Sequence, residues 1–166
     1  MSFLFKKKAA VEEKAEVKAD PEVADTRKLF DGVQLTQQTF KMGETLGTGT
    51  FGRVRLVTYE ANNVTNYFAL KILKKSEIIR LKQVEHIKAE KNILSSIAHP
   101  FIVNLFGSFQ DDSNIYMVME YVIGGELFSQ LRKAGRFVND TARFYAAEIV
   151  LALEYLHSKV CMVRLS

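Results

Sequence analysis

The chain is poor in the residues that build cross-linked proteins: its 166 residues include one cysteine, no tryptophan and two prolines. The single thiol, Cys161, can form neither an intrachain disulfide nor a thiolate metal cluster, which favours a reducing, intracellular compartment. The longest apolar stretch, residues 115–123, is interrupted by Glu120, so we expect no membrane span. The apolar residues 3–5 are too few for a signal-peptide core. We therefore expect a cytoplasmic location, with the nucleus as an alternative.

The chain also lacks a long run of one charge sign. Its net charge of +4 comes partly from Lys6, Lys7 and Lys8, and the remaining basic residues alternate with acids. Because nucleic-acid binding usually needs a basic stripe or patch, we expect no nucleic-acid partner. Residues 1–28 are rich in Lys, Glu and Ala, and we expect residues 1–39 to form a charged tail. The composition of the whole chain, 48% apolar and 25% charged, is typical of one globular domain.

A glycine-rich turn is the first motif with chemical content. Gly47, Gly49 and Gly52 are spaced as Gly-x-Gly-x-x-Gly, and the residues that follow alternate between basic and apolar as in a strand. Glycines at a hairpin tip let backbone N–H groups approach phosphate oxygens. Taken alone, the glycines fit a plain hairpin equally well. A dinucleotide-binding fold is disfavoured, because there the glycines open a helix.

A lysine on the next predicted strand, Tyr67–Leu73, strengthens the phosphate interpretation. Side chains alternate along a strand, so Ala69 and Lys71 share one face. Ala69 leaves room for a flat ring, and Lys71 reaches past it with a point charge. This arrangement suits a purine that carries phosphates.

A carboxylate on the following helix is the expected partner of Lys71. At 3.6 residues per turn, Glu90 lies near the centre of an apolar stripe. The stripe consists of Ile87, Ile93, Leu94 and Ile97. Because a buried, unpaired carboxylate is costly, we predict an ion pair between Lys71 and Glu90. Glu85 projects to the opposite face and is a poorer candidate.

The rest of the pattern predicts further strands and helices. Asn62 and Asn63 mark a turn, and Ser76 is the expected cap of a helix that runs to about Ile97. The other expected elements are strands near 102–109 and 115–121 and helices over 126–133 and 140–157. Asn139 is expected to cap the last of these helices.

The glycine turn, strand lysine and helix glutamate, in this order, resemble the protein kinase signature. Residues 115–122, 124–128 and 142–150 are similar to the AGC group of kinases, closest to the cAMP-dependent kinases. The resemblance implies an α+β fold, in which a kinase N-lobe of five antiparallel strands and a regulatory helix precedes the first helices of a helical C-lobe. The implied boundaries are a tail at 1–39, the N-lobe at 40–120, a hinge at 121–125, C-lobe helices at 126–158 and a divergent end at 159–166.

The same resemblance implies an ATP site. The glycine turn would cover the phosphates, and Lys71 would hold them while Glu90 orients it. Glu120 and Val122 would bind adenine through their main chains. Glu126 would serve the ribose and the basic residues that precede the phosphorylated Ser or Thr of a protein substrate. A regulatory subunit is a further implied partner. The implied nucleotide-binding residues are Leu46, Gly47, Thr48, Gly49, Thr50, Phe51, Gly52, Arg53, Val54, Ala69, Lys71, Met119, Glu120, Val122 and Glu126.

The C-terminal residues depart from the family pattern. Kinases continue with an Arg-Asp loop whose Asp accepts the substrate proton, and later residues hold Mg²⁺. Here Arg164 is in register with the loop arginine, but Leu165 stands at the Asp position. We therefore expect the chain to be truncated before the catalytic loop, to lack the catalytic base and the Mg²⁺ ligands, and to be inactive by itself.

Two other functions stay open at this point. The last predicted helix is apolar nearly all round, which favours burial against other protein. The alternative is therefore a non-catalytic interaction module that binds a regulator or competes with a longer kinase. A dinucleotide-dependent oxidoreductase rests on the glycines alone, and it lacks a following helix and a ribose-binding acid.

Overall fold

The computed structural model describes residues 26 and 28–163, with side chains described as far as Lys159. Within these residues the chain forms two compact units. We call residues 26, 28–98 and 104–121 the sheet unit, and residues 99–103 and 122–163 the helical unit. The first 25 residues of the predicted tail lie outside the described residues, as do Arg164 and Leu165.

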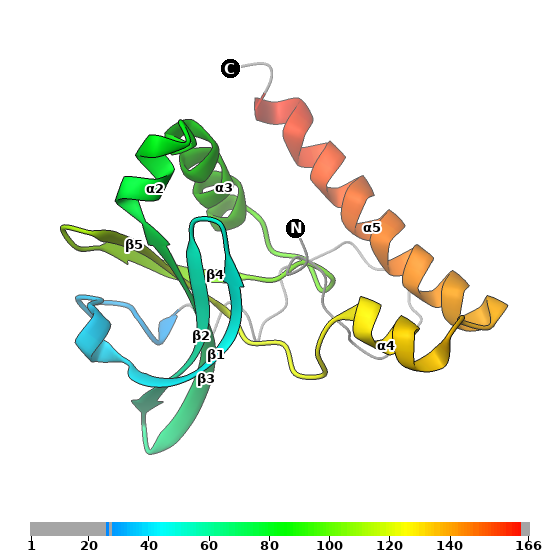
Figure 1. Ribbon diagram of the computed structural model, residues 1–166, viewed down its shortest axis with the longest axis horizontal. Coiled ribbons are helices and arrows are strands. Elements are labelled where there is room, and N and C mark those ends of the chain that lie inside the picture. The colour runs from blue at the N-terminus through cyan, green and yellow to red at the C-terminus, as the bar shows by residue number, and fades with distance from the viewer. Residues whose placement is uncertain (1–25, 27, 164–166) are drawn as a thin grey trace. The chain divides into compact units, whose positions relative to one another are not determined.

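The sheet unit contains the five antiparallel strands that the α+β prediction requires, so this prediction is confirmed. The strands are β1 (Lys41–Gly49), β2 (Gly52–Ala61), β3 (Val64–Lys74), β4 (Leu105–Gln110) and β5 (Asn114–Glu120). Their order in the sheet is β1-β2-β3-β5-β4, so β3 is the central strand (Figure 1). Strand β3 is longer than the predicted strand Tyr67–Leu73. A one-turn 3-10 helix, η1 (Gln37–Thr39), leads into β1.

The hairpin between β2 and β3 fixes the register of the sheet. Asn62 and Asn63 have φ values of 53° and 61°, in the left-handed region that asparagine tolerates and that a two-residue hairpin turn requires. The turn predicted at these residues is present. From this tip the β2–β3 ladder runs without a shift to the pair Gly52 and Leu73. The glycine turn and β3 are thereby locked to one another.

The two faces of the sheet carry different side chains. Lys71 on β3 pairs with Val54 on β2 and Met117 on β5, and cross-strand partners share a face. The adjacent residues Leu70 and Ile72 point to the opposite face. The main core cluster lies on that opposite face and consists of Phe30, Phe40, Val57, Phe68, Leu70, Ile72, Tyr116 and Val118. Lys71 is therefore on the face that this cluster does not occupy.

The region after β3 forms two helices rather than the single helix predicted from Ser76 to Ile97. Helix α2 spans Lys75–Arg80 and helix α3 spans Val84–Ser96. The helix break lies at Lys82, whose φ of 53° is incompatible with a continuous right-handed helix. Ser76 is also inside α2, because Lys74 occupies the N-cap position. The prediction of a Ser76 cap was wrong.

The apolar stripe of α3 is narrower than predicted. Ile87 and Leu94 are buried, as is Ile97, which follows the helix. Ile93 is 39% exposed, so its placement on the stripe was wrong. Ile87 and Ile93 lie at opposite edges of the stripe, three positions before and after Glu90, and only the edge with Ile87 is buried.

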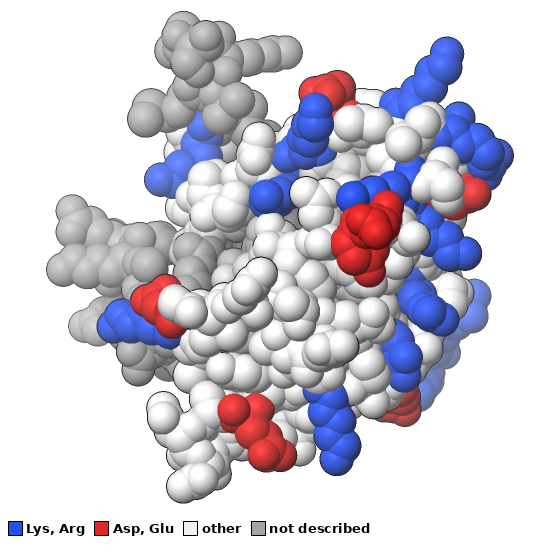
Figure 2. Space-filling view, turned by 90° about the vertical axis from the view of Figure 1, so that its left-hand side faces the viewer, with Lys and Arg blue, Asp and Glu red and all other residues white. Residues whose placement is uncertain are grey.

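The helical unit contains α4 (Leu127–Ala134) and α5 (Asn139–Val163). Gly124 and Gly125 have positive φ values of 115° and 74°, which explains the break that precedes α4. Asn139 was predicted as a cap but is the first residue of α5, and the Ala142 N–H donates to the Val138 carbonyl oxygen at 3.0 Å. None of the described helices is both long and apolar enough to cross a membrane. Figure 2 shows basic side chains in several groups with acidic side chains between them.

Candidate nucleotide site

The glycine turn is the tip of the β1–β2 hairpin, as the following strand predicted. Gly49 pairs with Gly52 across the tip, and Thr50 and Phe51 connect them. The Phe51 carbonyl oxygen accepts a hydrogen bond of 2.8 Å from the Lys74 N–H, which fastens the tip to β3. The hydrogen bond to β3 thus fixes the tip, and at its glycines no side chain covers the backbone.

Gly49 and Gly52 serve different purposes. A Cβ atom on Gly52 would lie 1.9 Å from the carbonyl oxygen of Ile72, so the backbone of β3 can come this close to residue 52 only because that residue has no side chain. A Cβ atom on Gly49 would meet no atom within 4 Å. Gly52 is therefore required by packing, whereas the space beside Gly49 is open to a ligand.

Lys71 forms the ion pair that its position predicts. Its Nζ lies 2.6 Å from Oε1 of Glu90, and the two side chains are 24% and 34% exposed. Strand β3 supplies the lysine and helix α3 supplies the carboxylate. A pair that is only partly exposed holds its geometry while keeping the ammonium accessible to a second anion.

Glu90 reaches Lys71 because of its place on α3. The buried side chains of Ile87 and Leu94 anchor the same side of the helix to the sheet unit. Glu85 points away and pairs with Lys88 at 2.9 Å, where its side chain is 83% exposed. Two acids on one helix thus have different partners, and the helical period separates them as predicted.

Three of the predicted adenine-binding residues, Val54, Ala69 and Met119, share the sheet face of Lys71. Ala69 pairs with Leu56 and Met119, which makes an apolar surface beside the lysine. Leu46 lies at a register shift in β1, between Thr45 and Gly47. Such a bulge re-aims a side chain.

Arg53 is the exception among the predicted residues. It pairs with Ile72, which places its side chain on the face opposite to Lys71. A part for Arg53 in nucleotide binding remains a prediction, and it can involve only the main chain.

The end of β5 contains an interaction that the sequence did not predict. Asn104, which is 2% exposed, donates from Nδ2 to Oε2 of Glu120 at 2.8 Å and from its main-chain N–H to the same oxygen at 3.3 Å. The Glu120 N–H donates to the Asn104 carbonyl oxygen at 2.9 Å. A lone asparagine before a strand carries no signal from which this contact could have been inferred.

Val122 and Glu126 belong to the helical unit. Val122 is half-buried, and Glu126 is exposed at the N-cap position of α4. The Glu126 carbonyl oxygen accepts hydrogen bonds from the N–H groups of Ser129 and Gln130, while its carboxylate makes no capping bond. The carboxylate therefore forms no hydrogen bond with the first turn of the helix.

Shifted pKa values occur at His99 and in the contact between Tyr116 and Asp111, as well as in the exposed pair of Glu77 and Arg80. Burial lowers the pKa of His99, whose Nδ1 accepts a hydrogen bond of 3.2 Å from the Phe101 N–H. Burial also raises the pKa of Tyr116, whose hydroxyl donates to Oδ2 of Asp111 at 2.7 Å. That hydroxyl, followed by the N–H groups of Asn114 and Ser113, lowers the pKa of Asp111.

Magnesium is the ion that the kinase resemblance implies, and the described residues do not fit it. No three of their His, Cys, Asp or Glu side chains come together as a possible metal site. Lys71 and Glu90 form a pair rather than a set of oxygen ligands, which Mg²⁺ requires. No chemical step of this part of the chain can therefore be assigned to the ion.

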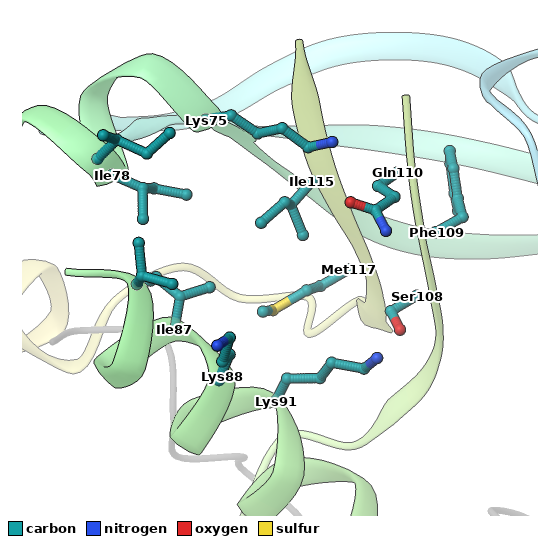
Figure 3. Close-up of a pocket in the computed structure, with 12 residues that line it drawn as sticks. Lys75, Ile78, Ile87, Lys88, Lys91, Ser108, Phe109, Gln110, Ile115 and Met117 are labelled. Carbon is teal, nitrogen blue, oxygen red and sulfur yellow. The ribbon is translucent and has the colours of Figure 1, made fainter. Parts of the chain in front are cut away.

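An apolar hollow of about 420 Å³ lies on the outside of the sheet unit, between α2, α3, β4 and β5 (Figure 3). Ile78, Ile87, Ile115 and Met117 point into it, and Lys75, Lys88 and Lys91 lie along its rim. Neither Lys71 nor any residue of the glycine turn lines this hollow. It is therefore a separate hollow from the predicted nucleotide site, although Met117 in its lining pairs with Lys71.

Comparison with known proteins places these features in one family. A family model described as "Protein kinase domain" matches residues 40–164. The chain is 54% identical over 125 residues to the "cAMP-dependent protein kinase type 3" of Saccharomyces cerevisiae, an alignment that covers 75% of this chain and 31% of the relative.

Two further relatives give the same picture. Identity is 56% over 119 residues to the "cAMP-dependent protein kinase catalytic subunit 3" of Drosophila melanogaster, covering 72% of this chain and 20% of the relative. The chain is 50% identical over 127 residues to the human "cAMP-dependent protein kinase catalytic subunit PRKX", an alignment that covers 76% of this chain and 35% of the relative. The chain thus spans about a fifth to a third of the length of these relatives.

Proposed function

The chain belongs to the protein kinase family, and we propose that it is the adenine-nucleotide-binding part of a serine/threonine kinase. The observation that carries the proposal is the ion pair of 2.6 Å between Lys71 and Glu90. Lys71 pairs with Val54, two residues along β2 from Gly52 of the glycine turn, and shares a face with Ala69. A positive charge, a bare backbone and an apolar surface are what a nucleoside triphosphate needs.

Each group has a distinct part in holding ATP. Backbone N–H groups of the glycine turn lie over the phosphates, and Lys71 contacts the α- and β-phosphates in the orientation that Glu90 imposes. Ala69 and Val54 contact the adenine ring. The main chain of Glu120 forms hydrogen bonds with its edge; for Val122, in the helical unit, this part stays what the family resemblance implies. These groups bind and orient the nucleotide, which is the positioning component of phosphoryl transfer.

The reaction itself needs groups that residues 1–166 do not supply. Mg²⁺, when bound to a kinase, neutralises charge on the phosphates and positions them, and an aspartate accepts the proton of the substrate hydroxyl. Leu165 stands where the family has that aspartate. We infer that the polypeptide of residues 1–166 alone transfers no phosphate, and that a longer product would do so with residues beyond this sequence.

Glu126 supports a protein substrate with basic residues, and the names of the relatives support a regulatory subunit as partner. The exposed carboxylate of Glu126, unused by the helix cap, suits a basic residue upstream of the target Ser or Thr. Several relatives are described as catalytic subunits of cAMP-dependent kinases, which supports a regulatory subunit as partner. We extend the proposal to a cytoplasmic location with access to the nucleus, which fluorescence imaging of the tagged protein tests.

The experiment is to purify the native protein with an antibody against this chain, measure its intact mass, and assay phosphotransfer to a peptide with arginines upstream of serine. A species larger than 18.9 kDa is expected to phosphorylate the peptide, and a species of 18.9 kDa is expected to be inactive. The recombinant Lys71→Ala variant sets the background. Phosphotransfer by an 18.9 kDa species that exceeds this background would contradict the inference of inactivity.

A second function is favoured by one observation in the helical unit. Val150, Leu151 and Leu153 on α5 are 61%, 46% and 42% exposed. Exposed apolar side chains on one helix favour a surface at which another protein binds. A non-catalytic module would form a stoichiometric complex with a purified kinase regulatory subunit in sedimentation experiments, and Val150→Lys would weaken it. Sedimentation as separate species would remove this alternative.

A further inference from the structure

Asn104 is the residue on which the inference rests. It directly precedes β4 and is 2% exposed, although its side chain is a polar amide. A buried amide must satisfy its hydrogen-bonding groups within the protein. Here Nδ2 donates to Oε2 of Glu120 at 2.8 Å, and a hydrogen bond to a carboxylate is stronger than one to a neutral acceptor.

The main chains of the same two residues are joined in an unusual way. In a hydrogen-bonded antiparallel pair, two facing residues normally exchange both of their N–H to carbonyl bonds. The Glu120 N–H does donate to the Asn104 carbonyl oxygen at 2.9 Å. The Asn104 N–H instead donates to the Glu120 carboxylate at 3.3 Å. The pairing therefore engages both the N–H and the side chain of Glu120.

The position of this pairing in the sheet gives it a consequence. Next to it, β4 and β5 pair at Leu105 and Met119, and the register shifts between Leu105 and Gly107. A shift of this kind disrupts the ladder locally. Phe68 of β3 pairs with Glu120 on one side, and Asn104 fastens Glu120 on the β4 side, beyond the shift.

We propose that Asn104 is a positioning residue for adenine, which fixes Glu120 so that its carbonyl group accepts a hydrogen bond from the exocyclic amine of the ring. The proposal rests on the function proposed above. A hydrogen bond to a ligand weakens steeply with misalignment, so the orientation of one peptide group decides its contribution. Asn104 acts on the base end of the nucleotide and has no part in holding the phosphates.

The test separates these two ends of the ligand. Adenosine and inorganic tripolyphosphate are titrated separately into the full 166-residue chain, and binding is followed by amide chemical shifts in NMR spectra. Asn104→Asp places a second carboxylate against that of Glu120, and Asn104→Ser removes only the side-chain amide. Asn66→Ala is the matched control, because its Nδ2 donates to the Val64 carbonyl oxygen at 3.1 Å, in the β2–β3 hairpin.

Both Asn104 variants are expected to weaken adenosine binding by roughly threefold to tenfold, which corresponds to the loss of about one hydrogen bond, and to leave tripolyphosphate binding unchanged. The swap Asn104→Asp with Glu120→Gln returns one donor amide to one carboxylate, and it is expected to restore most of the adenosine affinity. Asn66→Ala is expected to change neither affinity.

Three results would count against a role in positioning adenine. They are unchanged adenosine affinity in both Asn104 variants, an equal loss for adenosine and tripolyphosphate, and no rescue by the swapped pair. Failure of the proposed function itself looks different, because the unmodified chain would then bind neither probe. A variant that does not fold is recognised by its amide spectrum, and the other Asn104 variant then decides.

Discussion

Gly52 and Ile72 approach so closely that a Cβ atom on the glycine would lie 1.9 Å from the carbonyl oxygen of the isoleucine. No real contact of this kind exists, so the strands must separate if any side chain is placed there. Gly49, three residues earlier, has open space instead. The two glycines of one motif therefore respond differently to the same substitution.

Gly52→Ala is expected to lower the free energy of unfolding by about 1–3 kcal/mol, the usual cost of forcing extra atoms into a packed site. Gly49→Ala is expected to change it by less than about 0.5 kcal/mol, as a surface substitution does. Urea denaturation of both variants and the unmodified chain measures the difference. Equal destabilisation by both substitutions would contradict the packing role of Gly52.

His99 makes the stability of the chain depend on pH. Its ring lies 5.0 Å from that of Tyr155, and burial lowers its pKa below the ordinary 6.5. The folded state therefore binds the proton less readily than the unfolded state. The contribution is fully present above pH 6.5 and is lost as the pH falls through the lowered pKa of the folded state, because protonated Nδ1 no longer accepts the Phe101 N–H.

Replacement of His99 by phenylalanine tests this dependence. Between pH 7 and pH 5 the unfolding free energy of the unmodified chain is expected to fall more steeply than that of His99→Phe, by at most about 1.4 kcal/mol per pH unit for one proton. Denaturation at a series of pH values measures both slopes. Parallel slopes would show that His99 is not the group responsible.

The Tyr116 hydroxyl is the largest cause of the lowered pKa of Asp111. In Tyr116→Phe this donor is absent, so the Asp111 pKa is expected to rise toward its ordinary 3.8. The carboxylate contributes stability above that pH and loses it as the pH falls through its folded pKa. NMR titration of the Asp111 carboxyl carbon measures the shift. An unchanged midpoint would mean that the N–H groups of Ser113 and Asn114 suffice.

Lys82, two residues after the end of α2, has a φ of 53°, a conformation that is costly for a residue with a side chain. Lys82→Gly is expected to raise the free energy of unfolding by roughly 0.5–1 kcal/mol, after the greater entropy of glycine in the unfolded chain is counted. Thermal denaturation measures the gain, and Lys88→Gly, in the middle of α3, is the opposing control that should destabilise. A lower free energy of unfolding in Lys82→Gly would contradict the claim that the backbone at Lys82 is strained.

Lys82 also explains why the prediction of a single helix from Ser76 to Ile97 was wrong. The apolar spacing from Ile78 to Leu94 is compatible with one helix, and lysine is a good helix former, so nothing in the pattern marks Lys82 as a break. By contrast, the turn at Asn62 and Asn63 could be predicted from residue type. The pairing of Lys71 with Glu90 could be predicted because the strand alternation places the lysine and the helical period places the carboxylate.

What the pattern could not supply were contacts that depend on chain segments meeting in space. Asn104 and Glu120 are 16 residues apart, and only the sheet order brings them together. The distinction between Gly49 and Gly52 likewise depends on how closely β3 approaches β2. Neither contact leaves a periodic trace in the sequence.

The central claim is that Lys71 and the glycine turn hold the phosphates of a nucleotide, and titration of ATP into the 166-residue chain, followed by amide chemical shifts, tests it most directly. We expect weak binding, with a dissociation constant well above the micromolar range, and a change in the amide chemical shift of Gly49. Lys71→Ala is expected to weaken binding roughly tenfold, in line with the loss of one charge-assisted hydrogen bond.

Lys88→Ala is the matched control, because Lys88 also pairs with a glutamate of α3, at 2.9 Å, but on an exposed face. It is expected to bind ATP as the unmodified chain does. Equal affinity in Lys71→Ala and the unmodified chain would contradict the claim, and so would an equal loss in the Lys71 and Lys88 variants.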